Sequence, residues 1–582
     1  MASSGENKLP CLDSLPVEIL YRILDHLDGH SIILSFRYVC KKFAAVTNTY
    51  NRYKLDFTSI SKTDCHVICR AIKPENVIDL TISDGDMTPG QISLFLSLVT
   101  IDRYIKLRSL TLLDIDDEHL QRLLPHITGS RLLTSLSIKF RGTESAVTSA
   151  QASATISQAT LQRLEFDMRS SAMSQIRWPT NFTLHYLKIT ECTFEQFCVI
   201  LDHSPNLRTL VFRTGISDSI HETILKSYPQ LTSLSFNDAG IFKPVGELKS
   251  ILSITPSLKY LKVIVLISSE CLLDGSEWES IIGTYLPRLN RFEFCFSLPN
   301  ITNYNSLDLQ SRMARYRTPF WIETKRWNVV WNVVCTFDPT MHRILVYSTP
   351  MCLISYSFIS RYRKKAISIP VTITNFKTDL DIVSTISMTA TTEQQSISSN
   401  YDWFENVTDL TVHIDGLNLP DPFDLFPQSV DPSLIVKLSL PILCYARSIR
   451  NTITNVVSLL ERVYNVRSLS IFYRRSRNCP MVDIYRIYAV LPPRITHLTI
   501  EIMSVDDMEM LFERLVYLTS FTFVLSVHTK SFTAYIEWLR DNITDFTHVI
   551  DGNRIYVWLG NYRKKRKEFI VGSKRMKLSQ NS

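Results

Sequence analysis

The residues in this sequence with the most evident metal-binding potential are Cys65, His66 and Cys69, because zinc prefers thiolate and imidazole ligands. A tetrahedral zinc site needs further ligands, and the 12 cysteines include no C-x-x-C pair that could supply them. Half-buried free thiols on a helix are the alternative interpretation of the same three residues. We therefore predict no metal and no cofactor.

Motifs that carry catalysis or nucleotide binding are absent. The 15 glycines form no G-x-x-x-x-G-K-[ST] or G-x-G-x-x-G loop, and neither H-E-x-x-H nor G-x-S-x-G occurs. The 13 histidines are dispersed, and none stands near a Cys or Ser in a recognisable catalytic motif. These observations favour a non-catalytic protein.

The formal net charge of +7 resides in the last 21 residues, which hold eight basic side chains and one acid, Glu568. The remaining residues carry 55 basic and 55 acidic side chains, and a neutral body is not typical of a protein that coats nucleic acid. A basic run of this kind indicates nuclear import, phosphate binding or a solvated tail without a partner. The cluster predicted to direct import consists of Arg563, Lys564, Lys565, Arg566 and Lys567.

No segment of the sequence predicts insertion into a membrane. Residues 1–14 lack an apolar core typical of a secretory signal, and the longest uncharged apolar run, Ile344–Ser360, contains Pro350 and is too short and polar to span a bilayer. We therefore expect a reducing compartment, with the protein in the nucleus, the cytoplasm or both.

Residues 13–55 have the pattern of a small helical unit. Asp13 or Ser14 is expected to cap a first helix that Pro16 opens, and Ser31 to cap a second. Apolar residues recur at three- and four-residue spacing on the first helix, at Ile19, Leu20, Ile23, Leu24 and Leu27. So small a unit buries too little surface to be stable alone, so its apolar stripe needs the next domain or a partner.

The string Leu15-Pro16-x-Glu18-Ile19-x-x-x-Ile23-Leu24-x-x-Leu27, followed by Val39-Cys40-Lys41-x-Phe43, resembles an F-box. F-boxes dock the Skp adaptor of Skp–cullin–F-box ubiquitin ligases. One position departs from the family pattern, because Ser31 stands where an acidic residue is common. The resemblance implies that certain residues divide between internal packing and the adaptor groove, without showing which serve which: Leu15, Pro16, Glu18, Ile19, Ile23, Leu27, Val39, Cys40 and Phe43.

From Val77 onward the template L-x-x-L-x-[LIVF] recurs at intervals of 23–31 residues, as in leucine-rich repeats. The first half of the array spans 56–296 and the second half 402–560. Between them, 297–401 is predicted to be an irregular β-rich insert with an exposed loop at Ser384–Ser399. With a disordered 1–12 and a basic tail at 561–582, the predicted fold is α/β: a small helical F-box followed by a degenerate leucine-rich-repeat solenoid.

The predicted function is target recognition for a ubiquitin ligase, with the Skp adaptor, a cullin scaffold and an unknown protein as partners. Side chains alternate along a strand, so the residues between buried positions face the inner surface of the solenoid and are candidates for target binding. They include Arg163, Glu165, Tyr186, Lys188, Arg213, Tyr260, Lys262, Arg291, His413, Phe472 and His497, with Lys139, Glu293 and Glu501 beside them. Two alternatives stay open: a nuclear repeat protein whose tail binds nucleic acid, and an F-box scaffold that does not lead to degradation.

Overall fold

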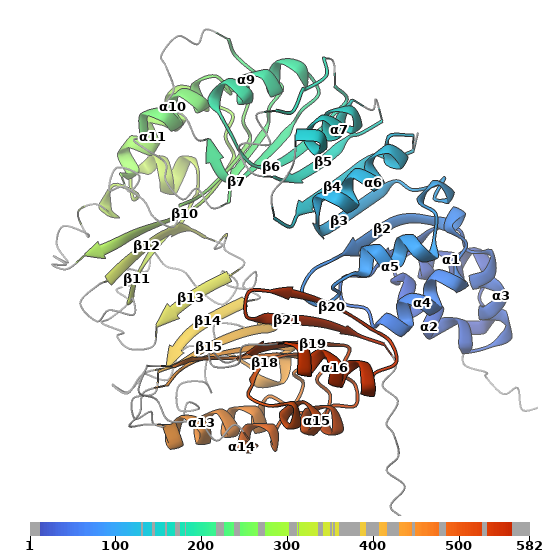
Figure 1. Cartoon of the computed structure of the whole chain (residues 1–582). Coiled ribbons are helices and arrows are strands. Elements are labelled where there is room, and N and C mark those ends of the chain that lie inside the picture. Colours follow the sequence, from blue (N-terminus) through green and yellow to red (C-terminus); the bar gives the residue numbers. More distant parts are fainter. Residues whose placement is uncertain are drawn as a thin grey trace, which may run out of the picture.

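The chain forms a strongly curved solenoid, with strands along its inner side and most helices along its outer side (Figure 1). The computed structural model describes residues 12–129, 132–142, 146–157, 160–168, 175–180, 182–216, 226–237, 245–265, 274–301, 311, 313–335, 342–349, 352, 355–359, 385–390, 407–415, 430–444, 449–475, 485–525 and 532–560. None of the helices within these ranges is long and apolar enough to cross a membrane.

Two sheets make up the inner surface. The first has the order β1-β2-β3-β4-β5-β6-β7-β8-β9-β10-β12-β11, and the second β13-β14-β15-β16-β17-β18-β19-β21-β20. The strands of the first sheet are β1 (Tyr53–Asp56), β2 (Val77–Ser83), β3 (Ser109–Ile115), β4 (Ser135–Phe140), β5 (Arg163–Asp167), β6 (Tyr186–Cys192), β7 (Thr209–Ile216), β8 (Ser233–Phe236), β9 (Tyr260–Val265), β10 (Arg291–Ile301), β11 (Val329–Cys335) and β12 (His342–Ser348). Those of the second are β13 (Ser355–Ile359), β14 (Thr385–Ala390), β15 (Asp409–Asp415), β16 (Lys437–Cys444), β17 (Ser468–Arg475), β18 (His497–Ile502), β19 (Ser520–Leu525), β20 (Phe546–Asp551) and β21 (Arg554–Leu559).

Helices join most of these strands and cover the sheets from outside (Figure 1). They are α1 (Val17–Leu24), α2 (Gly29–Leu34), α3 (Lys41–Thr49), α4 (Lys62–Ala71), α5 (Gln91–Leu98), α6 (Asp117–Thr128), α7 (Ala146–Ile156), α9 (Phe194–His203), α10 (Val245–Ser253), α11 (Gly275–Tyr285), α13 (Ile449–Arg462), α14 (Tyr485–Tyr488), α15 (Val505–Arg514) and α16 (Thr533–Asn542).

The repeat template is confirmed as a ladder of equivalent residues in parallel register. In the first sheet the central apolar residue of each repeat pairs with the next, through Leu80, Leu110, Leu136, Leu164, Leu187, Leu210, Leu234, Leu261 and Phe292. All of these side chains are buried. In the second sheet Leu410, Leu438, Leu469, Leu498 and Phe521 form the same kind of ladder. Each repeat therefore buries its apolar face against its neighbours, as a solenoid requires.

The segment expected to be an irregular insert, 297–401, is more regular than predicted in its described parts. Strands β11 and β12 pair antiparallel at the end of the first sheet, whereas β13 and β14 pair in parallel and start the second. The expected loop at Ser384–Ser399 begins with strand β14, where Ile386, Met388 and Ala390 alternate with hydroxyl residues. Alternation with period two is a strand pattern, and the high Ser and Thr content obscured it. The remainder of that predicted loop lies outside the described residues.

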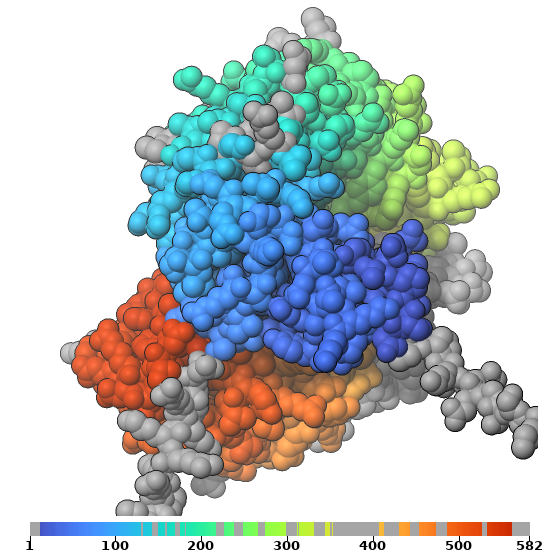
Figure 2. Space-filling model, turned by 90° about the vertical axis from the view of Figure 1, so that its right-hand side faces the viewer, coloured from blue at the N-terminus to red at the C-terminus, as the bar shows by residue number. Residues whose placement is uncertain are grey.

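The two ends of the solenoid contact each other, which the sequence did not predict. Trp558 in β21 is fully buried and donates from its indole Nε1 to the Ile60 carbonyl oxygen at 2.8 Å. Thr547 Oγ1 in β20 donates to the Pro89 carbonyl oxygen at 2.5 Å, and Lys62 Nζ lies 2.5 Å from Asp545 Oδ1. Viewed from the side, the blue N-terminal part and the red C-terminal part of the chain lie against each other (Figure 2). The last hairpin thus closes the solenoid against its first repeats.

Candidate functional site

The N-cap residues of the first two helices of the N-terminal unit differ from those expected. Pro16 is the N-cap of α1 and makes no side-chain cap hydrogen bond, so the N-cap is not Asp13 or Ser14 as predicted. For α2 the cap is Asp28, whose carboxylate accepts from Ser31 N at 2.7 Å and from Ser31 Oγ at 2.8 Å. An acidic residue therefore does serve this helix, three positions earlier than Ser31, which sequence spacing alone did not identify.

The core of this unit is continuous with the core of the first repeats. Leu20, Leu24, Ile32 and Phe43 are buried in the same apolar cluster as strands β1 and β2. Gly29 sits so close to β1 that an added Cβ would lie 2.7 Å from the Lys54 carbonyl oxygen, so only glycine fits there. The helices therefore cap the solenoid rigidly and do not hang on a linker.

Several apolar side chains of the unit are exposed and do not belong to its core. Their exposed fractions are high for apolar residues: Leu12 44%, Val17 38%, Ile19 39%, Tyr38 72% and Val39 68%. Lys42 Nζ joins the two segments that carry them by donating to the carbonyl oxygens of Asp13 at 2.5 Å and Leu15 at 2.8 Å. Large apolar side chains that stay exposed in a small unit are candidates for contact with a partner.

The predicted adaptor-binding residues separate into three groups in the structure. Pro16, Glu18, Ile19 and Val39 are exposed, Leu15, Ile23, Leu27 and Cys40 are half-buried, and Phe43 is buried. Phe43 stacks on Phe36 with ring centroids 4.3 Å apart, so it belongs to the internal packing of the unit.

Three exposed apolar residues of this unit, Leu12, Val17 and Tyr38, were missed by sequence reasoning. Val17 interrupts a recognised string and Tyr38 directly precedes one, so the signal available for these two was an apolar residue next to the motif, whereas Leu12 lies three positions before Leu15. Val17, between Pro16 and Glu18, is the clearest instance.

Comparison with known families matches the F-box domain to residues 12–55, the segment that forms this unit. Residues 12–55 are an F-box domain. F-box proteins are generally substrate-recognition adaptors without catalytic activity of their own. No curated protein matches the chain significantly.

One of the solved structures with a match is described as the "Crystal structure of TLR13-ssRNA13 complex". It is 14% identical, with a TM-score of 0.22, and the match covers 80% of this chain and 48% of that one. The chain thus spans about half the length of that protein, and the TM-score is too low for the match to support any argument about this chain.

Beyond the F-box, the inner surface of the first sheet carries an ordered network of charges. Glu165 pairs with Arg163 at 2.5 Å and with Lys188 at 3.1 Å, and the Arg163 guanidinium lies 3.8 Å from the ring centre of Tyr186. Asp167 pairs with Arg213 at 2.5 Å. The target-binding candidates of β5, β6 and β7 are therefore brought together and largely neutralise one another.

A second network lies on β9 and β10. Tyr260 donates from its hydroxyl to Glu293 at 2.7 Å, and Arg291 Nε donates to the same carboxylate at 2.6 Å. Burial, together with this carboxylate, raises the pKa of Tyr260, so its hydroxyl remains a donor at any physiological pH. Half-buried Lys262 lies on the same face.

The remaining candidates on the inner surface differ in how accessible they are. Phe472 and His497 are half-buried, and Glu501 is buried. Lys139 is exposed and pairs with Asp114 at 2.7 Å. The side chain of His413 and the proposed import cluster, Arg563–Lys567, lie outside the described part of the chain.

Proposed function

We propose that this chain is the target-recognition subunit of an Skp–cullin–F-box ubiquitin ligase. The observation that carries the proposal is the exposure of large apolar side chains on the F-box domain, at Leu12, Val17, Ile19, Tyr38 and Val39. These side chains are not part of the apolar core that the F-box shares with the solenoid, so they are available to a partner.

The rigid attachment of the F-box to the solenoid supports the same proposal. Because the two share one core, a target on the inner surface would be held at a fixed distance from the adaptor and the scaffold. Such a subunit supplies no catalytic group: it raises the effective concentration of target lysines near activated ubiquitin. The charge networks of β5–β7 and β9–β10 are the proposed target surface.

The experiment that tests adaptor docking introduces a charge at two exposed apolar residues of the F-box domain, Ile19→Glu with Val39→Glu. The double variant should lose co-purification with a co-expressed Skp adaptor, because two buried carboxylates would face an apolar groove. The matched control is Val516→Glu with Tyr517→Glu, a pair of similarly exposed apolar residues beyond the F-box. Wild-type adaptor recovery by the F-box variant would contradict the proposal.

The target surface needs a substitution set that respects the ion pairs. Reversing the charges of Arg163, Lys188 and Arg213 would place like charges beside Glu165 and Asp167. Neutralising all five, to Gln or Asn, removes the network without creating repulsion. The expected result is normal adaptor binding, lost capture of targets and slower target turnover, measured by quantitative proteomics in cells. Capture without any change in turnover would favour the non-degradative scaffold.

A further inference from the structure

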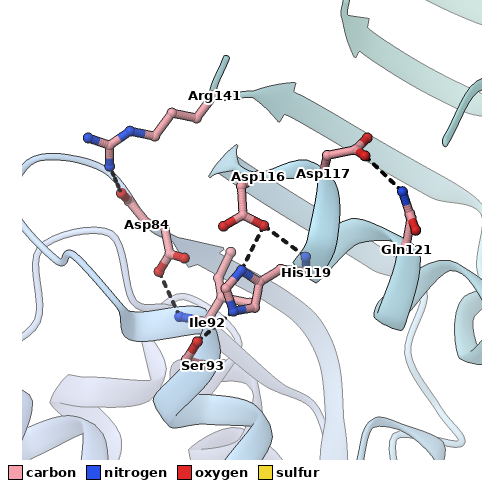
Figure 3. Close-up of polar contacts among 8 residues, drawn as sticks. All are labelled: Asp84, Ile92, Ser93, Asp116, Asp117, His119, Gln121 and Arg141. Carbon is pink, nitrogen blue, oxygen red and sulfur yellow. Dashed lines mark hydrogen bonds and ion pairs between the residues drawn. The ribbon is translucent and has the colours of Figure 1, made fainter. Parts of the chain in front are cut away.

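Three potential metal ligands meet where the first two full repeats leave the sheet. Asp84 directly follows β2, Asp116 directly follows β3, and His119 lies in the first turn of α6. One ligand atom from each of these residues lies within 4.8 Å of the others (Figure 3). Neighbouring repeats place equivalent positions side by side, which is why two residues far apart in sequence come together here.

The carboxylates retain free coordinating capacity. Asp84 uses Oδ1 to accept from Ile92 N at 2.8 Å, and Asp116 uses its own Oδ1 to accept from His119 N at 2.8 Å and to contact Nδ1 at 2.7 Å. Within the described part of the chain, the second oxygen of each carboxylate has no hydrogen bond. Oδ2 of Asp84 and Oδ2 of Asp116 therefore remain available to a cation.

Asp84 is the unusual member of the cluster, because its side chain is buried and, among the described residues, no Lys or Arg is in direct contact with its carboxylate. Its exposed fraction is 7%, and no Lys or Arg among the described residues forms an ion pair with its carboxylate. The nearby Arg141 donates instead to the Asp84 backbone oxygen, at 3.0 Å (Figure 3). A buried carboxylate is costly to keep charged when no cation is in direct contact with it, and a bound metal ion would lower that cost.

The histidine already has the outer partner that a metal-bound imidazole needs. Its Nε2 lies 2.5 Å from Ser93 Oγ on α5, while Nδ1 faces Asp116 (Figure 3). When Nδ1 coordinates a metal, the ring proton resides on Nε2, and Nε2–H can donate a hydrogen bond to Ser93 Oγ. Second partners of this kind fix the tautomer and the orientation of metal-binding histidines.

We propose that Asp84, Asp116 and His119 bind one divalent transition-metal ion, Zn²⁺ in the first instance. An imidazole with two carboxylates suits zinc better than Ca²⁺ or Mg²⁺, which prefer oxygen ligands alone. Three protein ligands leave a position for water. The ion ties the loop after β2 to the start of α6, and it is independent of adaptor docking, because the F-box contributes no ligand.

The test uses the full-length chain, freed of metal by a chelator and titrated with ZnCl₂, with bound zinc measured by mass spectrometry and unfolding followed by temperature. Wild type should bind one more zinc per chain than His119→Ala and Asp84→Asn, and only wild type should gain thermal stability from that zinc. Ser93→Ala should keep the site but weaken it by about tenfold or more.

The matched control is His126→Ala. This histidine lies on the same helix and also contacts a carboxylate, Asp102, at 2.8 Å, but no third ligand lies beside the two among the residues that the structure describes. The His126→Ala variant should bind zinc like wild type. Equal zinc stoichiometry and affinity in wild type, His119→Ala and Asp84→Asn would overturn the proposal, as would equal losses in the control.

A readout that needs no variant is the absorption spectrum of the wild-type chain with CoCl₂. Ligation by nitrogen and oxygen gives weak visible bands at one equivalent without an intense thiolate charge-transfer band. A spectrum showing thiolate ligation alone would place the metal on the cysteines, such as Cys65 and Cys69, and would also overturn the proposal.

Discussion

His497 shows how a residue on the inner surface can be part of the structure rather than of a binding site. It begins strand β18, and its Nδ1 lies 2.7 Å from Ser520 Oγ on the neighbouring strand. Burial lowers the pKa of His497 to about 4. The ring is therefore neutral in the folded chain at physiological pH, which makes it a poor partner for an acidic target.

This pKa predicts a pH dependence of stability. The folded chain resists protonation of His497 until about pH 4, whereas the unfolded chain binds the proton below about pH 6.5. The contribution of the neutral ring is complete above pH 6.5 and is lost as the pH falls toward 4. In His497→Gln, the loss of unfolding free energy between pH 7 and pH 4.5 should be smaller by about 2 kcal/mol. Urea unfolding at both pH values measures this, and equal losses in the two proteins would contradict it.

At the scale of the element, the strands were more predictable than the contacts among them. The template residues, such as Leu80 and Ile82, are buried because strand alternation and repeat length together determine which side chains face the helices. The Asp84–Asp116–His119 cluster depends on the register between repeats. The signal was present, since both aspartates follow their strands directly, but no spacing rule connects positions 84 and 119.

The helix caps also include one that can be predicted from the sequence and one that cannot. Thr193 and Gln196 form a capping box at the start of α9, with Gln196 N 3.2 Å from Thr193 Oγ1 and Thr193 N 2.9 Å from Gln196 Oε1. This reciprocal pattern is readable from sequence. The first helix instead has Pro16 as its N-cap, and Lys42 from α3 donates to the carbonyl oxygens of Asp13 and Leu15 just before it. A contact over that separation leaves no local trace in the sequence.

The capping box predicts the cost of one hydroxyl group. Thr193→Ala should lower the free energy of unfolding by about 1 kcal/mol, because it leaves Gln196 N without its acceptor. Ser253→Ala is the control, since that exposed hydroxyl only donates to Ser250 O within the last turn of α10. Denaturant midpoints of the two variants should differ, and matching midpoints would show that the cap contributes nothing measurable.

At the scale of the whole molecule, the contact between the two ends of the solenoid, which closes it, cannot be predicted from the repeats themselves. Trp558 belongs to the apolar cluster of the N-terminal half although it lies in the final strand. Around it, Lys62 is buried against Asp545 and the Arg141 guanidinium lies 5.8 Å from the ring centre of Tyr556. Repeats ordinarily contact only their neighbours, so solenoid sequences carry no periodic signal for a contact between first and last.

Closure predicts that damage to the last strand is felt at the first repeats. Trp558→Ala removes a fully buried indole and should destabilise by about 3–5 kcal/mol. Hydrogen exchange should accelerate in α4 as well as in β20 and β21. The control is Trp538→Ala, because this half-buried indole on α16 packs against Phe512 within the C-terminal half. If exchange in α4 stays unchanged in Trp558→Ala, the two ends are not energetically coupled.

The contact between Trp558 and Ile60 spans 498 positions, and this separation sets an order of events during synthesis. A ribosome releases the F-box and the first repeats long before it makes the hairpin that completes them. Until then, the surface that receives Trp558 faces water and Lys62 lacks its carboxylate partner. Nascent chains therefore expose an unfinished apolar edge until that hairpin is made, and exposed apolar surface of this kind is prone to aggregate. A chain stopped before residue 558 keeps that edge permanently, whereas its F-box sequence is intact.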